Sequence, residues 1–251
     1  MIPTVIILVV LTLAFAATIL APRLIPQRLK LDIAPDAPLP FGTEMSWLAV
    51  RTGDAQALAA VLQLTELRAA NWNSGIGAIY DDALADSYVF ISPPIGGWTL
   101  VGGVAVPLPA GGSFVDKTTP LLRRLSQSFS AAQYFACFPT IDYFAWARFE
   151  RGRRIRAFAV GDSGIVWNSG KPTPGERKLG LSFIELRGIK GRRGDIGGEL
   201  DLYPTEQHVL SVARSWSVDP MAAQSNDAGP AVGFIARAPQ TWRAERVRKV
   251  A

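Results

Sequence analysis

Residues 88–106, YVFISPPIGGWTLVGGVAV, decide the fold of this chain. Two apolar, β-rich runs flank a breaker formed by Pro93-Pro94 and Gly96-Gly97. Proline cannot donate a hydrogen bond to a strand ladder, and glycine adopts backbone angles that other residues avoid. The pattern therefore predicts a strand, a turn and a second strand. Because both runs are apolar at nearly every position, we expect both faces of these strands to be buried, or helices to cover the sheet.

The rest of the chain adds further strands and several helices around this pair. Short apolar runs predict strands at residues 45–51, 133–138, 142–150, 154–160 and 165–168. Helical spacing of apolar residues predicts helices at residues 55–64, 118–128 and 204–215. The turn at Arg151-Gly152-Arg153 joins two of the strands into a hairpin. We predict an α+β domain with a largely antiparallel sheet and packed helices.

The composition supports a substantial core. The chain has 251 residues with seven Trp, twelve Phe and five Tyr, and a formal net charge of +5. Large aromatic side chains bury extensive surface, so we expect Trp98 and Trp146 to be mostly buried. The single cysteine, Cys137, excludes a disulfide within the chain and lies in an apolar run, which favours a buried inert thiol over a nucleophile.

The N-terminus has the composition of a membrane helix. Residues 2–21 contain no charged side chain, and twenty helical residues span about 30 Å, the thickness of a hydrocarbon core. A cleaved signal peptide is the alternative, but no basic side chain precedes the apolar run. Arg23, Arg28 and Lys30 follow it, and positive residues tend to stay cytoplasmic. We expect a single-pass anchor in the inner membrane with the domain on the cytoplasmic side.

These features divide the chain into four parts. Residues 1–21 form the predicted transmembrane anchor, and the proline-rich residues 22–44 form an extended spacer. Residues 45–220 form the predicted α+β domain. Residues 221–251 are rich in small and polar residues and then basic, so we expect weak order there.

Arginines and aromatics alternate around the predicted hairpin. Such a patch can bind phosphate or nucleic acid, or it can be a solvated hairpin tip whose charge prevents edge pairing. The second interpretation is favoured. The candidate binding residues in and near this patch are Trp98, Trp146, Arg148, Arg154 and Arg156.

No residue set indicates catalysis, a metal or a cofactor. Asp81, Asp82 and Asp86 fit a solvated turn better than a metal site or an acid–base pair. His208 is the only histidine, and a packed or surface role is favoured over that of a base. The basic, glycine-rich residues 187–194 lack the arrangement of a phosphate-binding loop.

Four short motifs resemble those of a group of uncharacterised bacterial proteins. They are Trp72-x-x-Gly75, the run from Val89 to Pro94 with Gly97-Trp98, the strand Phe144-Ala145-Trp146-Ala147-Arg148, and Trp216-Ser217-Val218-Asp219-Pro220. The resemblance covers residues 46–220 and implies one compact domain. It carries no activity, and members of the group look soluble, so the anchor departs from the pattern.

Three functions are compatible with these observations. The favoured one is a non-enzymatic, membrane-anchored module that binds a protein, in an accessory or immunity-like role. The second is an enzyme that uses carboxylates such as Asp81, Asp82 or Asp142 with an arginine. The third is a protein that binds anionic lipid or nucleic acid through the basic hairpin and tail. A protein partner is favoured over nucleic acid.

Overall fold

The structure is a computed structural model that describes residues 12, 15, 31–109, 114–162, 164–180, 204–225 and 229–246. The chain divides into two compact units, Met1–Lys30 and Leu31–Ala251, and all elements below belong to the second unit. The predicted anchor at residues 2–21 lies outside the described residues, apart from residues 12 and 15. Among the residues that are described, no helix is long and apolar enough to cross a membrane.

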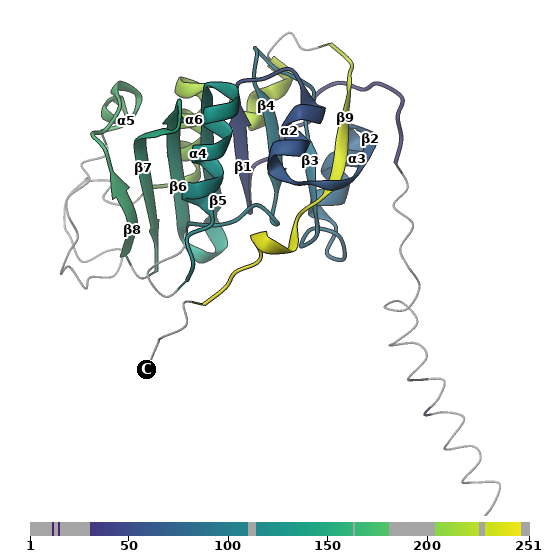
Figure 1. Ribbon diagram of the computed structural model, residues 1–251, viewed down its shortest axis with the longest axis horizontal. Helices are drawn as coiled ribbons and strands as arrows, with labels where there is room; N and C mark the ends of the chain where they lie inside the picture. The colour runs from purple at the N-terminus through teal and green to yellow at the C-terminus, as the bar shows by residue number, and fades with distance from the viewer. Residues whose placement is uncertain are drawn as a thin grey trace, which may run out of the picture. The chain divides into compact units, whose positions relative to one another are not determined.

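The domain is built on one large sheet (Figure 1). Its strands are β1 (Met45–Val50), β2 (Thr65–Asn71), β3 (Tyr88–Ile91), β4 (Thr99–Gly103), β5 (Ala131–Phe138), β6 (Tyr143–Glu150), β7 (Arg153–Gly161), β8 (Gly164–Ser169) and β9 (Val232–Arg237). They form a nine-stranded sheet in the order β2-β9-β3-β4-β1-β5-β6-β7-β8. Every neighbouring pair is antiparallel, which confirms the predicted large antiparallel sheet.

Residues 88–106 form the predicted strand pair. β3 and β4 pair directly, and the connection between them ends in a tight turn at Gly96-Gly97. Both glycines have positive φ, 56° and 82°, which the two central residues of a type I′ turn require. Ser92 extends the ladder beyond β3, because its N–H donates to the carbonyl of Leu100 at 2.8 Å and its hydroxyl accepts from the Leu100 N–H at 2.9 Å.

Helices cover both faces of the sheet (Figure 1). One face carries α2 (Ala55–Leu62) and α4 (Thr118–Phe129), whose leucines pack on apolar residues of the central strands. Asp54 caps α2 and accepts from the N–H of Ala57 at 2.8 Å. The other face carries α3 (Trp72–Tyr80), α5 (Pro174–Lys178) and α6 (Glu206–Trp216). The predicted strand runs are buried on two sides for this reason.

The face under α3 and α6 is packed with aromatic rings. Trp47 of β1 stacks on Phe135 of β5 with ring centroids 5.2 Å apart, and Phe135 lies 5.9 Å from Trp216 of α6. Trp72 of α3 meets Phe90 of β3 edge-on at 5.3 Å. These contacts bury aromatic surface from five elements of the domain.

The expected weak order after residue 220 is wrong for the described residues of that region. β9 lies inside the sheet and pairs with β2 on one side and β3 on the other. The short helices η2 (Pro220–Ser225) and η3 (Gln240–Trp242) flank it, and Trp242 is buried. β2 was not predicted, because the residues of this strand, TELRAAN, mix charged and small side chains without clear alternation.

Two glycines of α3 provide a sharp test of how this helix packs. A Cβ on Gly75 would lie 2.2 Å from the buried ring of Phe90, whereas a Cβ on Gly77 would meet nothing within 4 Å. We predict that Gly75→Ala lowers the free energy of unfolding by about 1–3 kcal/mol through overpacking. Gly77→Ala should raise it by about 0.5–1 kcal/mol, because alanine favours the helix. Urea denaturation measures both, and equal effects would contradict this packing.

The position of β9 predicts the outcome of a truncation. A chain that ends at Pro220 leaves β2 without the strand that joins it to the sheet. We expect this chain to lose its near-ultraviolet circular dichroism and its cooperative thermal transition. A chain that ends at Arg246 should retain both. Matching melting curves for the two truncated chains would show that β9 is dispensable.

Candidate functional site

An open groove of about 780 Å³ crosses one end of the sheet, and we call it the strand-end groove. Its lining comes from β4, β1, β5, β6 and β7, which are neighbours in the sheet, and from the end of α6. Because neighbouring strands are antiparallel, the C-terminal ends of β1 and β6 and the N-terminal end of β5 meet at this end of the sheet. The site is therefore assembled from segments that are distant in the sequence.

Arginines line most of the polar part of this groove. Arg51 follows β1, Arg148 lies in β6, and Arg151 and Arg153 belong to the β6–β7 turn and the start of β7. Arg148 bonds Glu150, with Nη2 to Oε1 at 2.6 Å and Nε to Oε1 at 2.8 Å. Glu150 is the only carboxylate in the described lining. The local charge of the groove is strongly positive.

Three of these arginines have no ion-pair partner among the residues that the structure describes. Arg51, Arg151 and Arg153 are exposed, and no described carboxylate lies within 4 Å of their side-chain nitrogens. Guanidinium groups can donate two parallel hydrogen bonds to a carboxylate or a phosphate. The groove therefore offers several anion-binding groups that the protein does not itself neutralise.

The backbone around the groove is held in uncommon conformations. Ser130 and Arg151 both have positive φ, 66° and 48°, and the N–H of Arg151 donates to the carbonyl of Ser130 at 2.9 Å. Glycine or asparagine fits such positions better than a long side chain. Ser130 is the C-cap of α4 and Arg151 begins the β6–β7 turn, so the end of a helix and a tight turn set the shape of this part of the groove.

Aromatic and aliphatic side chains complete the lining. Trp216 ends α6 and is 8% exposed, and Trp98 follows the Gly96-Gly97 turn and is half-buried. Ile155 of β7 is 42% exposed and so offers apolar surface to the groove. The expectation that Trp98 is mostly buried therefore holds only in part, because one side of this tryptophan faces the groove.

The five predicted binding residues do not form one surface. Trp98 and Arg148 line the groove. Arg154 is exposed but pairs with Phe149 of β6, which belongs to the core beneath α2 and α4, so its side chain lies on the α4 side of the sheet. A register shift next to Arg148 separates its face from that of Arg148.

Trp146 and Arg156, the other two predicted binding residues, are fully buried. Glu176 of α5 joins them, because its Oε1 accepts from Arg156 Nε at 2.7 Å and from Trp146 Nε1 at 2.8 Å. Arg156 Nη1 also donates to Asn168 Oδ1 at 2.8 Å. The prediction that Arg156 belongs to a surface patch is therefore wrong. Glu176 of α5 pairs with this arginine and buries it, and no pattern near Arg156 in the sequence indicates that contact.

The same network supports the groove. Oε2 of Glu176 accepts from the N–H of Thr173 at 2.7 Å, and the hydroxyl of Thr173 accepts from Trp216 Nε1 at 3.1 Å. Gln133 of β5 adds a second support, because its Nε2 donates to the carbonyl of Trp216 at 3.0 Å. Trp216 is thus fixed at the base of the groove by α5 and β5 together.

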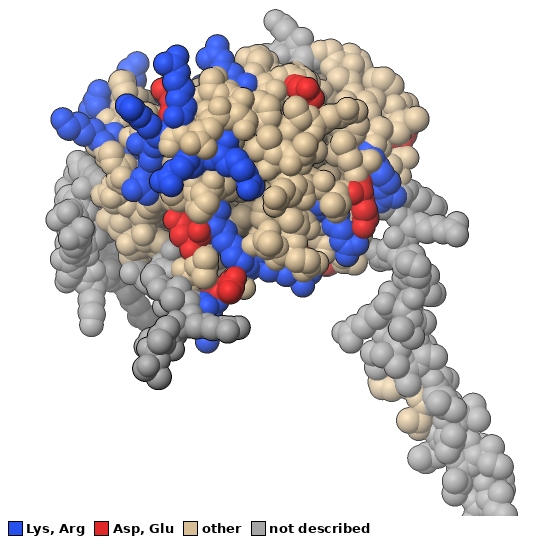
Figure 2. Space-filling view, viewed as in Figure 1, with Lys and Arg blue, Asp and Glu red and all other residues tan. Residues whose placement is uncertain are grey.

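Positive charge continues outside the groove. Figure 2 shows Lys and Arg side chains gathered at the upper left, over the region where α4, β6 and β7 lie in Figure 1. Exposed residues of this region include Arg123 and Arg124 on α4 and Arg154 on β7. Along the lower edge of the same view, Lys and Arg lie beside Asp and Glu, so the two signs offset each other there.

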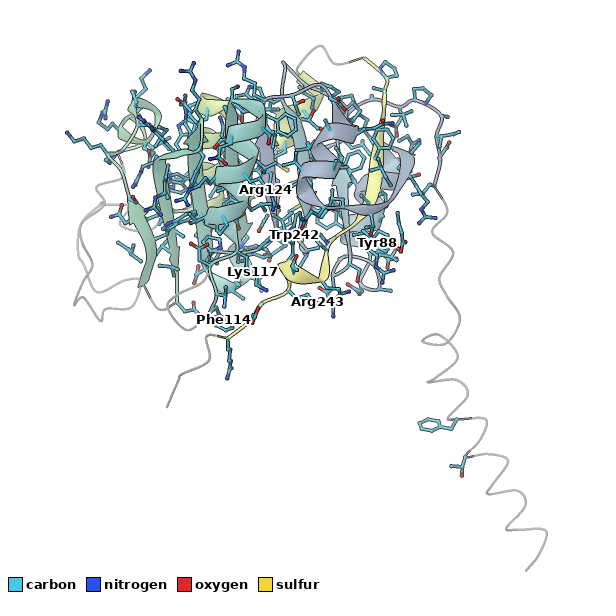
Figure 3. All side chains as sticks on the ribbon, viewed as in Figure 1. Tyr88, Phe114, Lys117, Arg124, Trp242 and Arg243 are labelled. Atoms are coloured by element: carbon cyan, nitrogen blue, oxygen red, sulfur yellow. The ribbon has the colours of Figure 1, made fainter. Side chains whose placement is uncertain are left out.

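A second pocket, of about 560 Å³, lies beside the C-terminal segment. Figure 3 shows Phe114, Lys117, Trp242 and Arg243 at this lower edge. Lys117 Nζ donates to the carbonyl of Arg243 at 2.5 Å and lies 3.4 Å from Glu245. Because this cation is held by the protein's own groups, the pocket is a weaker candidate for an anionic ligand than the groove.

The other residues considered for chemistry have local structural contacts. Asp81 accepts from the N–H of Ala83 at 2.9 Å, within the turn that follows α3. Nδ1 of His208 lies 3.0 Å from the N–H of Thr205, which completes a capping box on α6. Burial raises the pKa of the Cys137 thiol to about 12, so the thiolate is strongly disfavoured. Among the described residues, no group of three or more His, Cys, Asp or Glu side chains could hold a metal.

Sequence reasoning missed two important residues of the groove. Arg51 directly follows β1, 97 positions before Arg148, and Trp216 ends α6. No local pattern links these residues, because only the strand order β4-β1-β5-β6 brings them to one end of the sheet. The signal that sequence does contain is the turn at Arg151-Gly152, which marks this end.

Comparison with known proteins identifies no protein-family model that matches this chain, and no match among curated proteins or solved structures.

The buried ion pair beneath the groove predicts a large effect of a small substitution. Both side chains of the Arg156–Glu176 pair are almost fully buried, at 1% and 0% exposure. Glu176→Gln leaves the arginine charge without its counter-charge, and we expect a loss of about 3–5 kcal/mol in the free energy of unfolding. Glu150→Gln in the exposed pair is the control and should cost less than about 1 kcal/mol. Chemical denaturation compares the two, and similar losses would contradict the structural role of Glu176.

Proposed function

We propose that this protein is a non-enzymatic binding module that recognises a protein partner through the strand-end groove. The observation that carries the proposal is the convergence of Arg51, Arg151 and Arg153, without carboxylate partners in the described chain, beside exposed apolar surface. Interfaces between proteins combine such a charged rim with buried aromatic residues, among which Arg and Trp contribute most of the binding energy.

The shape of the groove also supports binding. It is open and wide, and its polar groups are mainly guanidinium groups, which donate hydrogen bonds but accept none and therefore cannot act as a general base. General acid–base chemistry needs a group whose pKa is near the working pH and that lies within reach of the substrate. Asp81, Asp82 and Asp142, the carboxylates considered for an enzyme, are not part of the groove lining.

The proposed location is the cytoplasmic face of the inner membrane. This part of the proposal rests on the uncharged residues 2–21 and on Arg23, Arg28 and Lys30 after them. The predicted spacer at residues 22–44 is wrong for its described part, because residues 31–44 pack on the domain. Phe41 is buried, and Asp36 accepts from the N–H of Trp72 at 2.7 Å. An accessory or immunity-like role in bacteria is consistent with such an arrangement.

Site-specific photocrosslinking in living cells tests the proposed function. We expect a benzophenone amino acid in place of Arg153, at the mouth of the groove, to trap a discrete protein in native membranes. The matched control replaces Arg68, an exposed arginine of β2 at the opposite edge of the sheet, with the same amino acid. It should trap no such protein.

Two results would overturn this function. One is equal trapping from both positions, which would show that the groove is not the interface. The other is a folded variant among Asp81→Asn, Asp82→Asn, Asp142→Asn and His208→Gln that is as defective in cells as a deletion but still traps the same protein. That outcome would favour an enzyme.

A further inference from the structure

We propose that the ligand of the strand-end groove is an extended acidic segment of about six residues with one apolar side chain, contributed by a partner protein. This inference rests on the proposed function and specifies the chemistry of the partner. It follows from three properties of the groove, which are its length, its charge and the position of its apolar residues.

The strand spacing sets the length of the ligand. The lining extends from Trp98, next to β4, to Arg153 and Ile155 of β7, and these strands are separated by β1, β5 and β6. Neighbouring strands lie about 4.8 Å apart, so the groove is about 19 Å long. An extended peptide rises by about 3.3 Å per residue, and about six residues therefore match this length.

The charge of the groove selects carboxylates. Arg51, Arg151 and Arg153 lie along this length and have no ion-pair partner in the described chain. Arg148 already bonds Glu150, which reduces the field at that point. The pattern suits separate carboxylates on a peptide, each of which can meet one guanidinium in a two-bond arrangement.

The exposed Ile155 marks where one uncharged side chain of the ligand lies. Ile155 is 42% exposed and lies at the β7 end of the groove, whereas Trp98 lies at the β4 end. Covering this surface would stabilise the complex by removing apolar area from water. Trp216 is held by hydrogen bonds to Thr173 and Gln133, so the part of the groove lining that Trp216 forms is in place before the ligand binds.

The same observations favour a peptide over a nucleic acid or a lipid surface. Single strands of nucleic acid bind by stacking their bases on open aromatic faces, but Trp216 is 8% exposed and Trp98 is half-buried. A lipid surface is attracted by basic side chains that lie at the outside of a protein, whereas these arginines line a recess that contains Glu150.

Fluorescence anisotropy tests this proposal with the full-length protein in nanodiscs of uncharged lipid. The probe is a labelled ten-residue peptide with six glutamates and one central phenylalanine. We expect saturable binding that weakens as salt rises, because the contacts are between charges. A peptide in which lysines replace the glutamates, and a labelled ten-residue thymidine oligonucleotide, should bind at least about tenfold more weakly.

Matched variants locate the binding in the groove. Arg51→Gln with Arg153→Gln should weaken peptide binding at least about tenfold, because two charged contacts are lost. The control, Arg68→Gln with Arg243→Gln, removes the same net charge from exposed arginines outside the groove and should change binding less than about twofold. Ile155→Ala should weaken binding severalfold, whereas Ile141→Ala, at a similarly exposed isoleucine outside the groove lining, should not.

Each contrary outcome has a separate meaning. Equal losses in the two arginine pairs would show a nonspecific charge effect, and tighter binding of the oligonucleotide would show a nucleic-acid site. Loss of peptide binding in nanodiscs that contain anionic lipid, with no loss in uncharged ones, would show that lipid occupies the groove. All three results overturn the acidic-segment proposal. If crosslinking at Arg153 still traps a protein, the binding function stands and only the ligand chemistry fails.

Discussion

The placement of β9 between β2 and β3 is the constraint on which the rest of the domain depends. β2 reaches the sheet only through its pairing with β9, and β9 also closes the far side of β3. β9, near the end of the described chain, is therefore needed to join β2, which begins at residue 65, to the sheet. Pairings between residues so distant in sequence require the chain to close long loops before they add stability.

The strand-end groove is built partly from the locally connected strands β5–β7 and partly from Arg51 and Trp98, which adjoin β1 and β4, and it has its own means of support. β5, β6, β7 and β8 follow one another in the sequence and in the sheet, so short turns fix their register. The buried Arg156–Glu176 pair then attaches α5 to β7, and Thr173 attaches Trp216 to α5. A buried ion pair is costly to desolvate, and replacing both partners with apolar residues is often neutral for stability. In this protein the ion pair also fixes the position of Trp216, the last residue of α6, because Glu176 bonds Thr173 and Thr173 bonds Trp216.

The sequence predicted elements well where the pattern was local. The pair at residues 88–106, the hairpin at Arg151-Gly152 and the helices capped near Asp54 and Thr205 all depend on spacing and turn chemistry within a few residues. β2 and β9 were missed because one lacks alternation and the other lies in a region whose composition is typical of weak order. Of the candidate site, Trp98 and Arg148 were identified, whereas Arg156 was misplaced because its partner Glu176 lies 20 residues further along. The burial of a charged side chain such as Arg156 by a distant element cannot be predicted from the residues next to it in the sequence.

The features that were hardest to predict are also those that reduce stability without ligand. Arg151 has a positive φ where glycine or asparagine would be less strained, and Ile155 leaves apolar surface in water. Arg51, Arg151 and Arg153 gather positive charge at one end of the sheet with one carboxylate among them. Other residues of the domain depart from local preferences in the same way, since Glu44, Gln63, Glu66 and Asp142 have positive φ and Ile141 is 52% exposed. At the groove these departures adjoin three arginines that have no ion-pair partner in the described chain. Backbone strain and charge that the protein does not neutralise are more frequent at functional sites than elsewhere, so their combination here supports the proposal that the groove binds a ligand.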